Sequence, residues 1–369
     1  MGFNCGIVGL PNVGKSTLFN ALTATISAQA ANFPFCTIEP NTGRVAVPDE
    51  RLDKLVALVN PKSIVPTQLE FVDIAGLVKG ASKGEGLGNQ FLANIRQTDA
   101  IIHVLRCFED DNITHVEGSI DPLRDAEIVE TELMLADLES LEKRIDQIVK
   151  KARGGDKEAK LQQAVIEPVL NALKQGKPAR VAAPDEAQKD EYKQYKMLQL
   201  LTSKPVLYVC NVDENSAATG NRFSEVVFEK AAKENAKAVI ISAEIESEVA
   251  QLDDPAEKQE FLQSLGLNET GLSKIIKAGY ELLGLQTYFT AGPKEVRAWT
   301  FLKGSKAPEC AGIIHSDFER GFIRAETISY EDYITLGGEQ ACKEAGKIRS
   351  EGKDYVVRDG DIMTFLFNV

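Results

Sequence analysis

The residues from Gly9 to Ser16 read Gly-Leu-Pro-Asn-Val-Gly-Lys-Ser and fit the pattern G-x-x-x-x-G-K-[ST]. The glycines of such a loop let backbone N–H groups surround phosphate oxygens, and the N-terminus of the helix that follows favours negative charge. We expect Lys15 to reach the β- and γ-phosphates and the Ser16 hydroxyl to ligate Mg²⁺. The loop therefore predicts a site for a nucleoside triphosphate, with the nucleotide held by Asn12, Val13, Gly14, Lys15, Ser16 and Thr17.

A second phosphate-sensing motif follows an apolar run at residues 69–72 and reads Asp73-Ile74-Ala75-Gly76. In this D-x-x-G arrangement we expect Asp73 to hold Mg²⁺ through water and the Gly76 N–H to contact the γ-phosphate. Residues 80–88 contain four glycines in nine positions, which is typical of a loop that orders and disorders with the nucleotide. Thr37 lies between the two motifs and is the expected switch residue that closes on Mg²⁺.

The base-recognition motif departs from the guanine-specific N-K-x-D. The apolar run at residues 206–210 leads into Asn211-Val212-Asp213-Glu214, so Val212 replaces the Lys and Glu214 replaces the Asp. A hydrogen-bonding site that loses its geometry loses discrimination steeply, which makes adenine a candidate base. Ser242 and Ala243, which follow the last apolar run, are expected to flank the base.

The catalytic group is less certain from the sequence. Leu77 stands where related enzymes carry a water-orienting Gln, and an apolar side chain cannot polarise water, so we expect slow hydrolysis or another group. Of three histidines, His115 in a polar loop is the candidate replacement. Asn12 could help to bind a monovalent cation such as K⁺. The residues predicted to act in catalysis are Lys15, Gly76 and His115.

Apolar runs alternate with helical segments in the first half of the chain and again at residues 205–241, which predicts an α/β fold with a mostly parallel sheet. The interruption between them is helical: Met134, Leu138, Leu141, Ile145 and Ile148 form a heptad seam, a second helix ends near Gly176, and a third is expected over 185–201. Short β-like runs follow at 296–301, 321–327, 355–357 and 362–365. The predicted domains are a nucleotide-binding domain at 1–126 and 205–284, a helical coiled-coil insert at 127–204, and a C-terminal α+β module at 285–369.

Composition and charge narrow the class of protein. The 369 residues are 43% hydrophobic and 26% charged, which is ordinary for a globular chain, and we expect no signal peptide, membrane span or sequence-specific DNA binding. Isolated cysteines in apolar runs indicate a reducing, cytoplasmic location. The net charge is −13, yet residues 141–204 carry 14 Lys or Arg and 9 Asp or Glu. This basic arm fits either RNA contact or solvated helix faces, and the sequence leaves both open.

Together these motifs resemble the Obg-related ATPases known as the YchF or Obg-like ATPase family. The resemblance covers nearly the whole chain and also rests on residues 32–41, 286–290 and 297–300. It implies a GTPase-like core, a coiled-coil insert and a C-terminal TGS domain of β-grasp type. It further implies that ATP is preferred over GTP, that hydrolysis is slow, that ribosomes or RNA are partners, and that Asn211 and Val212 read the adenine.

Two other functions fit the same residues. The chain could be a regulatory binding protein in which ATP is a structural cofactor and hydrolysis is incidental, which the Leu77 substitution favours. It could also be a conventional GTPase, which Val212 and Glu214 count against.

Overall fold

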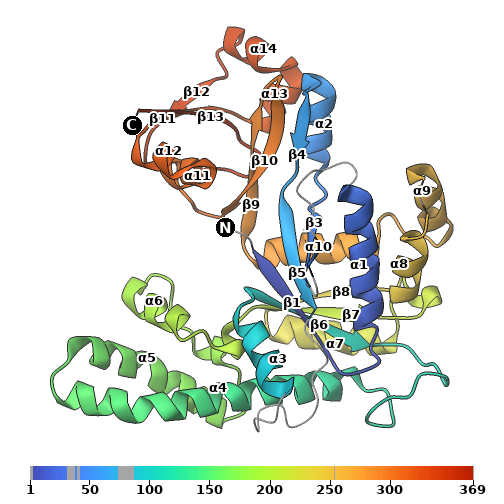
Figure 1. Ribbon diagram of the computed structural model, residues 1–369, viewed down its shortest axis with the longest axis vertical. Coiled ribbons are helices and arrows are strands. Elements are labelled where there is room, and N and C mark those ends of the chain that lie inside the picture. Colours follow the sequence, from blue (N-terminus) through green and yellow to red (C-terminus); the bar gives the residue numbers. More distant parts are fainter. Residues whose placement is uncertain (1–2, 31–37, 40–41, 74–86, 253, 369) are drawn as a thin grey trace. The chain divides into compact units, whose positions relative to one another are not determined.

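The computed structural model describes residues 3–30, 38–39, 42–73, 87–252 and 254–368. Thr37, Gly76 and Leu77 lie outside the described residues, and only the backbone of Asp73 is described. The chain packs into two compact units. The central unit comprises residues 4–21 and 71–272, and the terminal unit comprises residues 1–3, 22–70 and 273–369. Figure 1 shows the elements of both, which are described in turn.

The central unit is built on a parallel sheet. Strand β1 pairs with β6, β6 with β7, and β7 with β8, all in parallel. Every residue of β6 and β7 is buried, which is typical of strands covered on both faces and explains their continuous apolar sequences. The predicted parallel α/β sheet is thereby confirmed. Its strands are β1 (Asn4–Val8), β6 (Ala100–Arg106), β7 (Val206–Asn211) and β8 (Lys237–Ile241), joined by the end of β5 (Gln68–Asp73).

Helices connect these strands, as parallel pairing requires. Helix α1 follows the first strand directly, and the rest of the unit's helices precede or follow the later strands (Figure 1). Their bounds are α1 (Lys15–Ala30), α3 (Leu87–Arg96), α7 (Arg222–Lys233), α8 (Ala243–Val249) and α9 (Pro255–Ser264), with a short 3₁₀ turn η4 (Glu214–Ser216).

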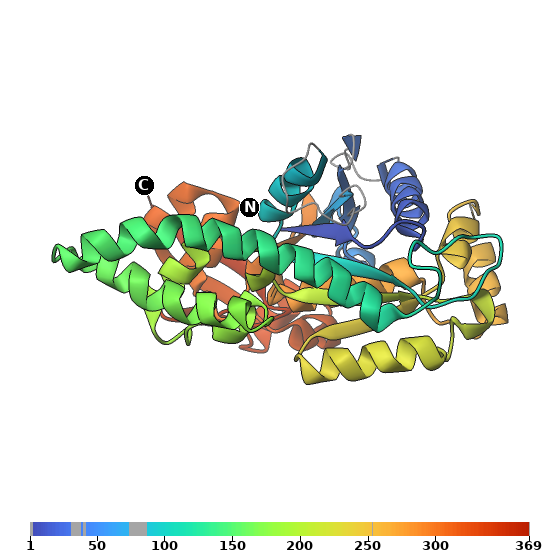
Figure 2. The same cartoon turned by 90° about the horizontal axis from the view of Figure 1, so that it is seen from below.

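A helical arm leaves the sheet between β6 and β7. Helices α4 (Pro122–Arg153) and α5 (Lys157–Lys174) run side by side as a long hairpin (Figures 1 and 2). Asp121 caps α4 by accepting from the Arg124 N–H, and Pro122 stands at the first helical position. Helix α4 continues without a break past residue 126, so the first turns of the arm belong to the segment assigned to the nucleotide-binding domain.

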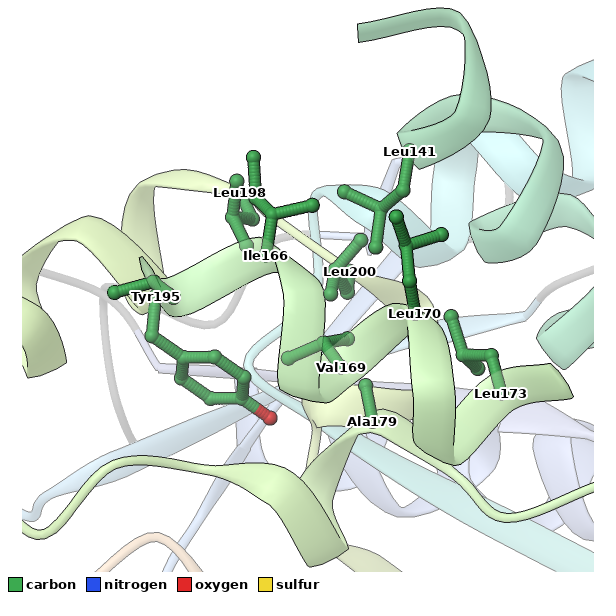
Figure 3. Packing of buried hydrophobic residues seen from close by; sticks show 10 residues of the cluster. Leu141, Ile166, Val169, Leu170, Leu173, Ala179, Tyr195, Leu198 and Leu200 are labelled. Carbon is green, nitrogen blue, oxygen red and sulfur yellow. The ribbon is translucent and has the colours of Figure 1, made fainter. Parts of the chain in front are cut away.

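The arm has a hydrophobic core of its own. Leu141 is fully buried there, and the other four residues of the predicted heptad seam pack against the same cluster. Figure 3 shows the buried side chains converging from α4, α5 and the segments that follow. The third helix is shorter than predicted: α6 spans Lys189–Met197, and Gln199 at φ 50° ends the helical path. The 3₁₀ turns η2 (Ala179–Ala182) and η3 (Leu201–Ser203) complete the arm.

The terminal unit holds a mixed six-stranded sheet in the order β12-β11-β13-β9-β10-β4. The predicted strand at 355–357 is wrong, because that segment contributes only an isolated bridge between Lys306 and Val356. The strands are β4 (Ser63–Val65), β9 (Leu285–Ala291), β10 (Glu295–Leu302), β11 (Phe322–Ile328), β12 (Arg349–Glu351) and β13 (Ile362–Phe367). The helices are α2 (Glu50–Val59), α10 (Gly271–Leu282), α11 (Ala307–Ile314), α12 (Ser316–Arg320), α13 (Tyr330–Leu336) and α14 (Glu339–Glu344), and strands β2 (Ile38–Glu39) and β3 (Thr42–Ala46) form an antiparallel pair.

Sequence reasoning did not foresee that α2 and β4 join this C-terminal sheet. Strand β4 pairs in parallel with β10, and Leu52 and Leu55 of α2 are buried among residues of β9 and β10. Arg51 donates to the Asp359 carboxylate at 2.8 Å, which fixes the start of α2 to the turn before β13. Asp359 in turn accepts from the Thr287 N–H of β9. Pairing between segments this far apart in the chain leaves no local pattern.

Among the described residues, no helix combines the length and the apolar composition that a membrane span requires.

Candidate nucleotide-binding site

The P-loop connects β1 to α1 and depends on its glycines for both conformation and space. Gly9 has φ 156°, and a Cβ there would lie 2.4 Å from the Val104 carbonyl oxygen of β6. Gly14 has φ 96°, and a Cβ there would lie 2.4 Å from Nδ2 of Asn211. Both distances are far below van der Waals contact, so a side chain at either position would push the loop off the sheet. The sequence pattern thus encodes close packing as well as phosphate access.

The side chains expected at the phosphates lie at the start of α1. Lys15 is 8% exposed, and its Nζ donates to the Leu10 carbonyl oxygen at 2.7 Å, within the P-loop itself. Ser16 and Thr17 are exposed in the first turn of the helix. A buried ammonium group beside two accessible hydroxyls at a helix N-terminus suits a polyphosphate and its cation.

Asn211 joins the P-loop to the opposite side of the site. Its Nδ2 donates to the Val13 carbonyl oxygen at 2.9 Å, and its Oδ1 accepts from the Ala243 N–H at 2.9 Å. The side chain is 4% exposed, so these bonds are shielded from water. Asn211 stands at the end of β7 and Ala243 follows β8, which places both at the carboxyl edge of the parallel sheet, where ligands bind in α/β folds. The structure therefore brings together three predicted site segments.

The remaining base-site residues are arranged around the same edge. Val212 is 2% exposed and its N–H donates to the Ile241 carbonyl oxygen, so it contributes an apolar wall where an N-K-x-D protein has a lysine. Ser242 caps α8 by accepting from the Ile245 N–H. Burial, and then the negative charges of Glu244 and Glu248, raise the pKa of the Glu214 carboxyl. Glu214 thus lies in acidic surroundings that favour hydrogen-bond donors on a ligand.

The loop at residues 107–121, which joins β6 to α4, also borders the P-loop. Asn12, at φ 61°, donates from Nδ2 to the Thr114 carbonyl oxygen at 3.1 Å. Sequence reasoning missed the residue that shapes this loop. The Arg106 guanidinium is 2% exposed and donates to three carbonyl oxygens, those of Phe108, Asp110 and Ile113. A charged residue at the end of an otherwise apolar strand was the available signal.

His115, the predicted catalytic histidine, is buried in this loop rather than exposed. It is 8% exposed, and its Nε2 lies 2.8 Å from Oδ2 of Asp125 in the first turn of α4. Its Nδ1 accepts from the Glu117 N–H at 3.1 Å. Both ring nitrogens therefore have protein partners in this conformation. The catalytic role of His115 stays a prediction, and it cannot involve direct contact with water while both bonds are made.

The expected Mg²⁺ ligands are only partly described. Ser16 presents its hydroxyl at the start of α1, and the backbone of Asp73 ends strand β5, which belongs to the same sheet as β1. Thr37 lies outside the described residues, as do Gly76 and Leu77. A serine hydroxyl and a carboxylate are the oxygen donors that Mg²⁺ prefers, so the donor chemistry fits this cation.

Comparisons with known proteins agree with this architecture. A family described as "50S ribosome-binding GTPase" matches residues 4–135, and YchF-GTPase_C, described as "Protein of unknown function (DUF933)", matches residues 285–368. The chain is 59% identical to the "Ribosome-binding ATPase YchF" of Bacillus subtilis and 60% identical to that of Haemophilus influenzae, over 100% of each chain. It also matches the solved "Structure of the Schizosaccharomyces pombe YchF GTPase" with a TM-score of 0.88 and 40% identity, covering 99% of this chain and 98% of that one.

Proposed function

The chain belongs to the YchF family of P-loop nucleoside triphosphatases, and from that premise we propose that it binds and slowly hydrolyses ATP as a switch acting on the ribosome. The observation that carries the proposal is the nucleotide edge of the sheet, where Asn211 bridges the P-loop and the loop before α8 while Val212 replaces the guanine-reading lysine. Ribosome association rests on the names of the relatives, both of which are called ribosome-binding.

Binding of MgATP is expected to rearrange the P-loop locally. Lys15 would exchange its bond to the Leu10 carbonyl oxygen for bonds to the β- and γ-phosphates, which are stronger because the acceptor is charged. The Ser16 hydroxyl would ligate Mg²⁺, with Thr37 and Asp73 completing the protein's share of the ligands, and Thr17 would lie near the α-phosphate. The cation neutralises charge on the β- and γ-oxygens during transfer to water.

Hydrolysis is proposed to be slow because Leu77 occupies the place of the water-orienting Gln. The Gly76 N–H would sense the γ-phosphate, and its loss on hydrolysis would release the glycine-rich segment at 80–88. We also propose that Asn12 helps to hold a K⁺ ion beside the phosphates. Turnover in KCl should then exceed turnover in NaCl at equal ionic strength, and equal rates in the two salts would remove K⁺ from the mechanism.

The domain assignment follows the same proposal. Residues 1–126 and 205–284 would form the nucleotide-binding domain, 127–204 the coiled-coil insert, and 285–369 a TGS module of β-grasp type. Movement of the switch segments would reposition the arm and the module on the ribosome, and a ribosome partner places the protein in the cytoplasm.

Nucleotide preference is tested by competition. Fluorescent ATP and GTP analogues are bound to purified protein with Mg²⁺ and displaced by each unlabelled nucleotide. We expect ATP to bind more tightly, and the double variant Val212→Lys with Glu214→Asp, which rebuilds N-K-x-D, to shift preference toward GTP. Tighter GTP binding by the unaltered chain would return the protein to the conventional GTPases.

A second measurement separates the switch from a regulatory binding protein. Release of phosphate is followed with and without ribosomes at saturating ATP. Stimulated turnover supports a switch on the ribosome. Turnover that ribosomes leave unchanged would favour a protein in which ATP is a structural cofactor.

A further inference from the structure

His115 stands between the P-loop and the long helix of the arm. The carbonyl oxygen of the preceding residue, Thr114, accepts from Asn12 Nδ2 at 3.1 Å. The imidazole itself contacts Asp125 in the first turn of α4 at 2.8 Å. One continuous path of hydrogen bonds and chain therefore runs from the phosphate-binding loop through His115 to α4.

The hydrogen bonds assign a protonation state to His115. Nδ1 accepts from the Glu117 N–H, so Nδ1 carries no proton in this arrangement. Nε2 faces the carboxylate of Asp125, which only accepts when ionised, so Nε2 carries the proton. The ring is thus a neutral Nε2–H imidazole held on two sides. Arg124 donates to the second carboxylate oxygen of Asp125, which offsets the cost of burying that charge.

The fixed ring has a consequence for the P-loop. With His115 pinned and Arg106 holding the rest of the loop, the Thr114 carbonyl has little freedom, and it is the acceptor for the Asn12 amide. Holding Nδ2 fixes the plane of that amide and therefore the direction of its Oδ1. Asn12 also occupies a left-handed conformation at φ 61°, which a fixed side chain helps to maintain.

We propose that His115 and Asp125 are positioning residues that act on hydrolysis through Asn12. Neither side chain touches the reacting atoms; together they hold the Thr114 carbonyl in place, and that carbonyl orients the P-loop amide. The inference rests on the proposed ATPase function and deepens it. It reassigns the histidine that sequence reasoning had placed among the groups that act on water.

The test is a double-variant cycle on the full chain. Asp125→Asn keeps the shape and removes the charge, Asn12→Gly removes the amide and tolerates the positive φ, and the third protein carries both changes. Glu127→Gln is the matched control, because it removes one charge from an exposed residue in the same turn of α4. kcat and KM for MgATP are measured for each, and circular dichroism checks the fold.

We expect Asp125→Asn to lower kcat about tenfold, as loss of a supporting hydrogen-bond partner does elsewhere, with KM changed less than about threefold. The double variant should match Asn12→Gly within about twofold, since both changes break the same path. Independent losses that multiply would overturn the proposal, as would an equal loss in Glu127→Gln. If Asp125→Asn does not fold, His115→Gln, whose amide can still donate to Asp125, takes its place in the cycle.

A spectroscopic readout is independent of turnover. The chain has three histidines, so ¹⁵N-histidine labelling gives three ring systems, and His115→Gln assigns one of them. The unaltered protein should show His115 with a protonated Nε2 and an unprotonated Nδ1, and Asp125→Asn should mix the tautomers. A protonated Nδ1 in the unaltered protein contradicts the inference. Absence of ATP hydrolysis in the unaltered protein would instead sink the proposed function.

Discussion

Asn211 offers the sharpest test of how the site is assembled, because one side chain bridges two segments that both face the nucleotide. Asn211→Ala removes the donor to the Val13 carbonyl oxygen and the acceptor for the Ala243 N–H, each at 2.9 Å. Both contacts are buried. A buried polar group left without its partner costs about 1–3 kcal/mol, so two such groups set a range of about 2–6 kcal/mol.

Part of that range will not appear in the folded protein, since water can enter an open nucleotide site and bond to one of the exposed groups. We therefore expect a loss of about 2–4 kcal/mol in the free energy of unfolding, measured by urea denaturation. ATP must then order the P-loop on binding. If about 1.4–2.8 kcal/mol of the loss reappears there, Kd for ATP rises about 10- to 100-fold.

Two variants separate the contributions. Asn211→Asp keeps an acceptor for the Ala243 N–H but places an oxygen against the Val13 carbonyl, so it isolates the P-loop contact. Asn215→Ala is the control, because Asn215 is an exposed asparagine four residues further along. Isothermal titration with ATP and Mg²⁺ gives Kd for each protein. A Kd for Asn211→Ala within about twofold of the unaltered chain would refute the bridging argument, and so would an equal loss in Asn215→Ala.

Two further predictions concern the core of the sheet and the tip of the arm. Burial, and then the positive charges of Lys230, Lys15 and Arg180, lower the pKa of His103 from its ordinary value of 6.5 to about 3. Its stabilising contribution is therefore complete above pH 6.5 and is lost as the pH falls toward 3, by about 2 kcal/mol at pH 5. Urea denaturation of His103→Phe at pH 8 and pH 5 should show a correspondingly smaller decline than the unaltered chain, and an identical decline would contradict the assignment. Glu substitution of the exposed basic residues at the tip should weaken ribosome or RNA binding at low salt and leave Kd for ATP unchanged, and unchanged binding would exclude the arm as a contact: Lys150, Lys151 and Arg153.

The phosphate-binding half of the site could be read from the sequence because its chemistry is local. Gly14, Lys15 and Ser16 are adjacent, and a strand before them and a helix after them complete the motif. The heptad seam of the arm was readable for the same reason, since residues four and three apart share a helix face, and Leu141 is buried with its seam partners. Likewise, continuous apolar runs predicted the buried parallel strands β6 and β7.

Tertiary structure alone decided what depends on distant residues. No pattern could show that β4 pairs with β10 across more than two hundred residues, because the energy of a strand edge depends on whichever partner reaches it. The burial of His115 was equally hidden. A polar sequence around it predicted an exposed side chain, but Asp125 and the Glu117 N–H supply both ring nitrogens with partners, and Arg106 folds the loop over them. Sequence composition records which groups need hydrogen bonds, whereas only the packed chain determines which groups provide them.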